Sequence, residues 1–237
     1  MNLSIEQIKA SQLAYIKAGG EDDITLQAKY YARPASYRIA WLLMRIGFSA
    51  NQVTLLALAT TIIGGVLLSF NFPFSIIGII FLLFSHLLDY VDGTIAKATN
   101  TISKFGWYLD RTCDEIVETV IPISIGVSLF IKGSNFLGIN PTVFLILGFL
   151  YAILHLLSVA SVNNLRLACG NTTREHFTTL SWWKRLYCIG TNVRSSTIPI
   201  LAIMFFIPNG LAIFLMAFTA LTLCELLLGI GKAVLNR

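Results

Sequence analysis

Four aspartates stand at fixed spacing in an otherwise apolar stretch of the chain: Asp89, Asp92, Asp110 and Asp114. A carboxylate in the middle of a membrane-spanning helix opposes insertion by roughly 2.5 to 3.5 kcal/mol, so the four together would cost about 10 kcal/mol if uncompensated. Convergent carboxylates without His or Cys ligands suit a hard divalent cation such as Mg²⁺ or Mn²⁺ rather than zinc. We expect one or two such ions, which can also clamp a phosphate or pyrophosphate.

Two neighbouring helices are expected to position these carboxylates. Asp89 and Asp92 are three residues apart, and Asp110 and Asp114 are four apart, so each pair shares one helix face. The connection between the two helices is short, which makes them antiparallel neighbours. The two pairs are therefore predicted to converge.

Small residues and one lysine accompany the aspartates: Gly93, Ala96, Lys97 and Gly106. Small residues in membrane helices are common where two helices pack closely. Next to carboxylates they can instead leave room for a ligand against the backbone, and the pattern does not decide between these readings. Lys97 is well placed to meet a phosphate.

The composition is that of an integral membrane protein, with 56% hydrophobic and 12% charged residues and a mean hydropathy of +0.75. A span takes about 20 apolar helical residues. Six spans are predicted, in an all-α protein, near residues 50–70, 74–97, 105–131, 141–165, 193–208 and 210–233. The segment 193–208 is the shortest and contains Pro199 and Pro208.

Lysines and arginines are distributed unequally between the two sides of these spans. They lie before the first span, in the connections between spans two and three and between spans four and five, and after the last span. The segments on the opposite side contain only Lys132. The positive-inside tendency therefore predicts that both termini and the aspartate cluster face the cytoplasm. The net charge of +5 fits this topology and anionic membrane lipids, and no module for nucleic acid is present.

Three regions are expected along the chain. Residues 1–33 form a polar N-terminal segment, and residues 34–48 form an amphipathic helix lying in the membrane interface, with an aromatic and basic rim. Residues 49–237 form a single six-helix membrane domain.

The acidic pattern resembles the signature of the CDP-alcohol phosphotransferase (phosphatidyltransferase) family, DxxDGxxAR x8 GxxxDxxxD. In this chain it reads Asp89-x2-Asp92-Gly93-x2-Ala96-Lys97-x8-Gly106-x3-Asp110-x3-Asp114. Every spacing matches, and only Lys97 departs, because the family usually has Arg there. Residues 49–56 are also similar to the start of the family's first span. Among the branches, the chain looks closest to the one resembling phosphatidylinositol-phosphate synthases.

This resemblance implies roles for the matched residues. Asp89, Asp92 and Asp110 would hold two divalent metal ions, and Asp114 would contribute to the metal site and act as general base. The residues Gly93, Ala96, Lys97 and Gly106 would line the site of a CDP-linked lipid donor such as CDP-diacylglycerol. The implied reaction transfers the substituted phosphate to a small polar alcohol, with release of CMP, in phospholipid biosynthesis. The resemblance also implies a homodimer.

The acceptor stays open between inositol phosphate, inositol, glycerol phosphate, serine and an amino alcohol. Three arginines are candidates for binding an acceptor phosphate: Arg194, Arg166 and Arg174. Their alternative role is to set the topology.

Two other functions compete with the transferase. Intramembrane acids also line cation or proton transporters. A transport path should cross the membrane, however, and these acids cluster on two helices at one face. An inactive scaffold of the same fold is the other alternative, and the complete set of aspartates argues against it.

Overall fold

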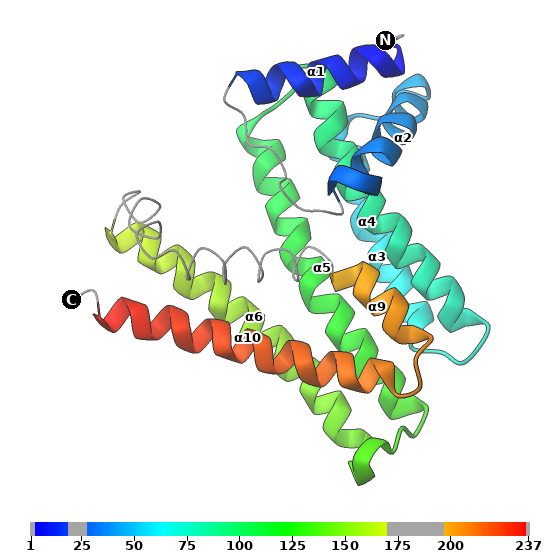
Figure 1. The fold of residues 1–237 in the computed structure, drawn as a ribbon, viewed down its shortest axis with the longest axis vertical. Helices are drawn as coiled ribbons and strands as arrows, with labels where there is room; N and C mark the ends of the chain where they lie inside the picture. Colours follow the sequence, from blue (N-terminus) through cyan, green and yellow to red (C-terminus); the bar gives the residue numbers. More distant parts are fainter. Residues whose placement is uncertain (1–2, 19–27, 170–196, 236–237) are drawn as a thin grey trace. The chain divides into compact units, whose positions relative to one another are not determined.

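The computed structural model describes residues 3–18, 28–169 and 197–235 (Figure 1). Every regular element among these residues is helical, which confirms the all-α prediction. The elements are α1 (Ile5–Lys17), η1 (Ala28–Ala32), α2 (Arg33–Arg45), α3 (Ala50–Leu68), α4 (Phe74–Ala98), α5 (Lys104–Ile131), η2 (Phe136–Gly138), α6 (Pro141–Cys169), α9 (Thr197–Phe205) and α10 (Gly210–Leu235). They form two compact units, one of Met1–Gly64 with Ile77–Val117 and one of Gly65–Ile76 with Glu118–Arg237.

Among the residues that the structure describes, four helices are long and apolar enough to cross a membrane: Ala50–Leu68, Phe74–Ala98, Pro141–Ser161 within α6, and Gly210–Leu227 within α10. Between 39% and 44% of each of these apolar windows is buried inside the protein, so the rest of each helix is left for lipid. The predicted third span appears as α5, which is 28 residues long but carries charged residues along its first half. The predicted fifth span appears in the described residues only as the nine-residue α9.

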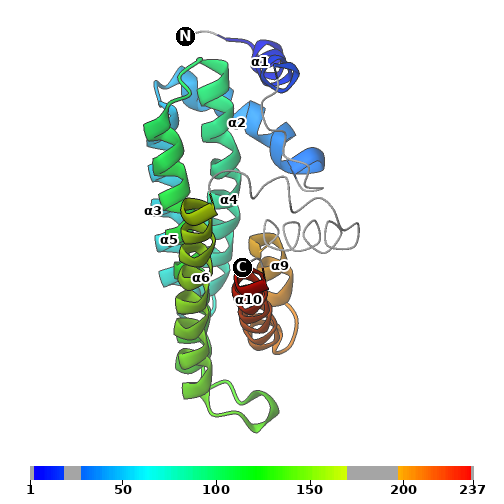
Figure 2. The same ribbon diagram turned by 90° about the vertical axis from the view of Figure 1, so that its left-hand side faces the viewer.

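The first unit has a core to which α1, α2, α3 and α4 all contribute. Its buried members include Ile8 of α1, Ala40 of α2, Val53 of α3 and Val91 of α4. Both ribbon views place α1 at the same end of this unit as the connection from α4 to α5 (Figure 1 and Figure 2). The N-terminal segment predicted as merely polar therefore contains a helix that packs on this unit.

The helices α1 and α2 are shaped by local sequence signals. The start of α1 has a complete capping box, in which Ser4 and Gln7 each satisfy a backbone N–H of the other. The amphipathic helix predicted at residues 34–48 appears as α2, which has proline in its first turn. Its aromatic and basic residues interact, since the guanidinium carbon of Arg45 is 4.1 Å from the centre of the Trp41 ring.

Local backbone chemistry sets the tight connection between α4 and α5. After the last residue of α4, Asn100 adopts a left-handed conformation with a φ of 54°, and the N–H of Thr101 donates to the carbonyl of Ala96 at 2.9 Å. The Ser103 hydroxyl then accepts a 2.9 Å hydrogen bond from the N–H of Gly106, which caps the start of α5. These caps end one helix and begin the next over a short connection, so the acidic segments of both helices stay close in space.

In the second unit, α10 packs along α6. Close helix approach is clearest between α5 and α6, where a Cβ added at Gly126 would lie 2.7 Å from the Phe144 carbonyl oxygen. The reciprocal contact places a Cβ at Gly148 only 2.6 Å from the carbonyl oxygen of Pro122. Glycine at these two positions is required by packing, which is one of the two roles that the sequence leaves open for small residues.

Candidate functional site

The metal candidates come from α4 and α5, as the sequence predicts. Asp89, Asp110 and Asp114 each offer a carboxylate oxygen, and the three oxygens lie within 4.8 Å of one another. Asp89 is exposed, and the other two side chains are half-buried. The antiparallel pairing of the two helices therefore brings together three of the four predicted carboxylates.

The fourth aspartate is buried and has its own hydrogen-bond partners. One carboxylate oxygen of Asp92 accepts a 2.6 Å hydrogen bond from the hydroxyl of Thr54 on α3. Its other oxygen accepts from the backbone N–H of Gly93. The 2.6 Å distance is typical of O–H···O⁻ bonds, which are stronger than bonds between neutral groups. Thr54 thus holds the Asp92 carboxylate in a fixed orientation.

The donor set fits a hard divalent cation. Oxygen ligands around an octahedral Mg²⁺ at about 2.0 to 2.1 Å are themselves about 2.9 to 4.2 Å apart, so oxygens within 4.8 Å need only a small movement to share one ion. Without a cation, two ionised carboxylates at 4.8 Å would repel by about 3.5 kcal/mol at an effective dielectric of about 20. The nearby guanidinium of Arg111 makes an ion pair with Glu115, at 2.8 Å along the same helix. A divalent cation bound between these carboxylates would offset their repulsion.

The two glycines of the acidic pattern have surroundings unlike those of the packing glycines of α5 and α6. A Cβ added at Gly93 would have no heavy atom within 4 Å, so no neighbouring helix requires glycine there. A Cβ at Gly106 would lie 3.1 Å from the Ser103 hydroxyl oxygen and 3.3 Å from the Asn51 side-chain oxygen. At Gly93, then, the structure favours open space over tight helix packing.

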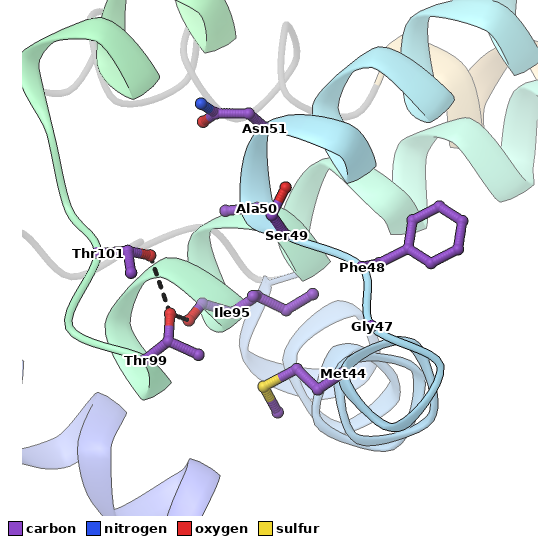
Figure 3. A pocket seen from close by; sticks show the side chains of 9 residues that line it. All are labelled: Met44, Gly47, Phe48, Ser49, Ala50, Asn51, Ile95, Thr99 and Thr101. Carbon is purple, nitrogen blue, oxygen red and sulfur yellow. Dashed lines mark hydrogen bonds between the residues drawn. The ribbon is translucent and has the colours of Figure 1, made fainter. Parts of the chain in front are cut away.

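A cavity of about 410 Å³ opens between the start of α3 and the end of α4 (Figure 3). It is lined by Met44, residues 47–50, Asn51, Ile95, Thr99 and Thr101. Figure 3 shows Asn51 extending from the start of α3, and the hydroxyls of Thr99 and Thr101 hydrogen-bonded to each other at 2.9 Å. Asn51 also has its side-chain oxygen close to Gly106, and Gly106 lies about one helical turn before Asp110 on α5. The Asn51 end of the cavity is therefore near the acidic cluster.

Lys97 lies near the end of α4, and its surroundings include the N-terminal helix. The ammonium nitrogen of Lys97 is 5.0 Å from the centre of the Tyr15 ring of α1. The preceding residue, Ala96, is half-buried, and its carbonyl takes part in the cap that ends α4. The lysine of the acidic pattern therefore meets an aromatic ring from a helix outside that pattern.

The three arginines predicted to bind an acceptor are only partly covered by the structure. Arg174 and Arg194 lie outside the described residues. Arg166 lies near the end of α6. Their role at the acceptor therefore stays a prediction.

Three residues near the acidic pattern received no role from the sequence. Asn51 and Thr54 are three residues apart on α3. The side-chain oxygen of Asn51 lies close to Gly106, and the hydroxyl of Thr54 donates to Asp92. Both lie within residues 49–56, so polar residues in that stretch were a signal that could have indicated them. Tyr15, by contrast, lies far from Lys97 in the sequence, and no pattern links the two.

Comparison with known proteins relates the chain to one family and to a relative from an archaeon. The family model for CDP-alcohol phosphatidyltransferase matches residues 48–230 of the chain. An archaetidylinositol phosphate synthase of Pyrococcus horikoshii is 30% identical over 95 residues, which are 40% of this chain and 50% of that protein. The match thus spans about half the length of this curated relative. Because the family model covers well over half of the sequence, the chain belongs to the CDP-alcohol phosphatidyltransferase family.

Proposed function

We propose that this protein is a metal-dependent membrane transferase of phospholipid biosynthesis. It moves a phosphatidyl group from a CDP-linked lipid, CDP-diacylglycerol, to a small polar alcohol and releases CMP. The observation that carries the proposal is the cluster of three carboxylate oxygens within 4.8 Å, from Asp89, Asp110 and Asp114. Family membership supports the same chemistry.

The four aspartates have different roles in this proposal. Asp89, Asp92 and Asp110 hold Mg²⁺ or Mn²⁺, two ions in all, with Asp114 completing the metal site. A divalent cation held there supplies positive charge that offsets the negative charge of the donor's diphosphate. Thr54 keeps the Asp92 carboxylate oriented through its 2.6 Å hydrogen bond.

Asp114 is the proposed general base. It accepts the proton of the acceptor hydroxyl, which must come within about 2.6 to 3.2 Å of a carboxylate oxygen. The acceptor oxygen forms a bond to the β-phosphorus of the donor as the bond between that phosphorus and the bridging oxygen breaks. CMP leaves with the bridging oxygen, and the lipid phosphate stays on the acceptor.

The donor is proposed to lie along Gly93, Ala96, Lys97 and Gly106. The open space at Gly93 leaves room for a phosphate against the backbone, and the ammonium group of Lys97 supplies positive charge. The cavity lined by Asn51 and the two threonines is proposed to receive the cytidine end of the donor, since the Asn51 oxygen is close to Gly106.

The proposed acceptor is inositol phosphate. The relative named as an archaetidylinositol phosphate synthase supports this choice, and so does the resemblance to the branch that uses inositol phosphate. Arg194, Arg166 and Arg174 are proposed to bind the acceptor's phosphate.

For the membrane arrangement, we propose six spans, with α5 and the segment 193–208 added to the four apolar helices. Residues 1–33 precede an interfacial helix at residues 34–48, and residues 49–237 form the membrane domain. Both termini and the active site face the cytoplasm, and the protein is a homodimer. The excess of Lys and Arg in the predicted cytoplasmic segments supports this orientation.

Release of CMP tests the reaction directly. Purified protein is incubated with Mg²⁺ or Mn²⁺, CDP-diacylglycerol and a panel of alcohols that includes inositol phosphate. We expect metal-dependent CMP release, which Asp114→Asn reduces by about 10²- to 10⁴-fold, the usual contribution of a general base. Glu115→Gln is a matched control, because Glu115 is an acid on the same helix that pairs with Arg111.

Two results would contradict this function. The first is an Asp114→Asn variant that keeps most of its activity, which would remove the proposed base. The second is a folded wild-type protein that releases no CMP with any acceptor but conducts cations in liposomes, which would favour the transporter.

A further inference from the structure

The N-terminal helix α1 precedes the segment matched by the family model, yet one of its side chains lies near the end of α4, the helix that carries most of the proposed donor-site residues. Ile8 of α1 is 1% exposed and belongs to the same buried cluster as Val91 and Ile95 of α4. Gln12, one turn further along α1, is also buried. One face of α1 therefore lies against the first unit's core beside α4.

Tyr15 continues this buried face of α1. Ile8, Gln12 and Tyr15 follow one another at intervals of four and three residues, which places them on one stripe of the helix. The ring centre of Tyr15 is 5.0 Å from the ammonium nitrogen of Lys97, within the range of about 6 Å for a cation–π interaction. The packing of α1 thus brings an aromatic face to the positive charge of the proposed donor site.

We propose that Tyr15 is a positioning residue for Lys97. The inference rests on the proposed function, because it assigns to Lys97 a donor phosphate as its ligand. A lysine side chain loses much rotamer freedom when its ammonium group binds one phosphate. By restricting the ammonium group before the donor arrives, the Tyr15 ring lowers that entropy loss and strengthens donor binding.

The position of α1 does not depend on Tyr15 alone. Ile8 is almost fully buried, whereas Tyr15 is only half-buried, and the capping box at Ser4 stabilises the start of the helix. Replacing the Tyr15 ring should therefore leave α1 in place and remove mainly the contact with Lys97.

A double-mutant cycle on the full-length protein tests the proposal. The variants are Tyr15→Leu, Lys97→Met and the two combined, with Tyr15→Phe and Leu13→Ala as controls. Leu13 is 50% exposed on α1. The measurements are the KM for CDP-diacylglycerol, kcat, and the Kd of CDP with Mg²⁺ by calorimetry.

We expect Tyr15→Leu to raise KM and the Kd of CDP about two- to fivefold, the size of an exposed cation–π interaction, with kcat unchanged. Tyr15→Phe keeps the aromatic face and should behave as wild type, as should Leu13→Ala. In the Lys97→Met background, Tyr15→Leu should have no further effect, because its partner is already absent.

If Tyr15→Leu raised KM and the Kd of CDP by the same factor in the wild-type and Lys97→Met backgrounds, the proposal would be overturned, since Tyr15 would then act through packing alone. Wild-type affinity in Tyr15→Leu would overturn it too. These outcomes differ from a failure of the proposed function, which would show as a wild-type protein that releases no CMP with any acceptor.

Discussion

The hydrogen bond from Thr54 to Asp92 gives a sharp prediction, because both side chains are buried and the substitution can be nearly isosteric. Thr54→Val replaces the hydroxyl with a methyl group and keeps the branched shape. It removes the 2.6 Å donor from the Asp92 carboxylate and leaves the hydrogen bond from the N–H of Gly93 in place. The backbone of α3 should not need to move.

The size of the effect follows from the charge on the acceptor. A hydrogen bond to a charged group contributes about 1.5 to 3 kcal/mol, which corresponds to about a 10- to 100-fold change in an equilibrium constant. Loss of a partner that orients a metal ligand typically has a similar effect on metal affinity. We therefore expect the apparent affinity for Mg²⁺ or Mn²⁺ to fall about 10- to 100-fold in Thr54→Val.

The assay is a metal titration of CMP release at saturating CDP-diacylglycerol, for wild type, Thr54→Val and Thr54→Ser. Thr54→Ser keeps the hydroxyl and should stay close to wild type. Thermal unfolding of each variant controls for loss of folded protein. An unchanged metal dependence in Thr54→Val would refute the role given to this hydrogen bond.

Two further predictions concern the donor site. Gly93→Ala should raise the KM for CDP-diacylglycerol about tenfold, because the added methyl group overlaps with the donor, and it should leave the unfolding temperature unchanged. Gly148→Ala is the comparison variant. It should lower the unfolding temperature, because its Cβ would lie 2.6 Å from the Pro122 carbonyl oxygen. A lower unfolding temperature in Gly93→Ala but not in Gly148→Ala would contradict the assignment of open space to Gly93 and close helix packing to Gly148. Asn51→Ala should weaken CDP binding about two- to tenfold by removing a hydrogen-bonding group from the pocket, while Leu55→Ala, exposed on the same helix, should not. If calorimetry gave the same CDP affinity for Asn51→Ala and wild type, the cavity would be ruled out as the binding site for the cytidine end of the donor.

The acidic spacing was enough to predict which helices meet. Three- and four-residue intervals place Asp89 with Asp92 and Asp110 with Asp114 on shared helix faces, and a short connection requires the helices to be neighbours. Helix bounds also followed from the apolar pattern, since α4 and α5 begin and end within a residue of the predicted spans.

The sequence alone left the role of each small residue undecided. Glycine is compatible with close helix packing and with ligand access, and only the atoms around it distinguish the two. The structure places backbone against Gly126 and Gly148 and leaves open space at Gly93.

The sequence by itself determined the all-helical class and the convergence of acidic residues from two helices, and it predicted a hard cation for them, because helical periodicity and residue type are local properties. Only the tertiary structure decided that Thr54 orients Asp92 and that Tyr15 faces Lys97. Those contacts join residues far apart in the chain, and their geometry depends on how several helices pack around one core.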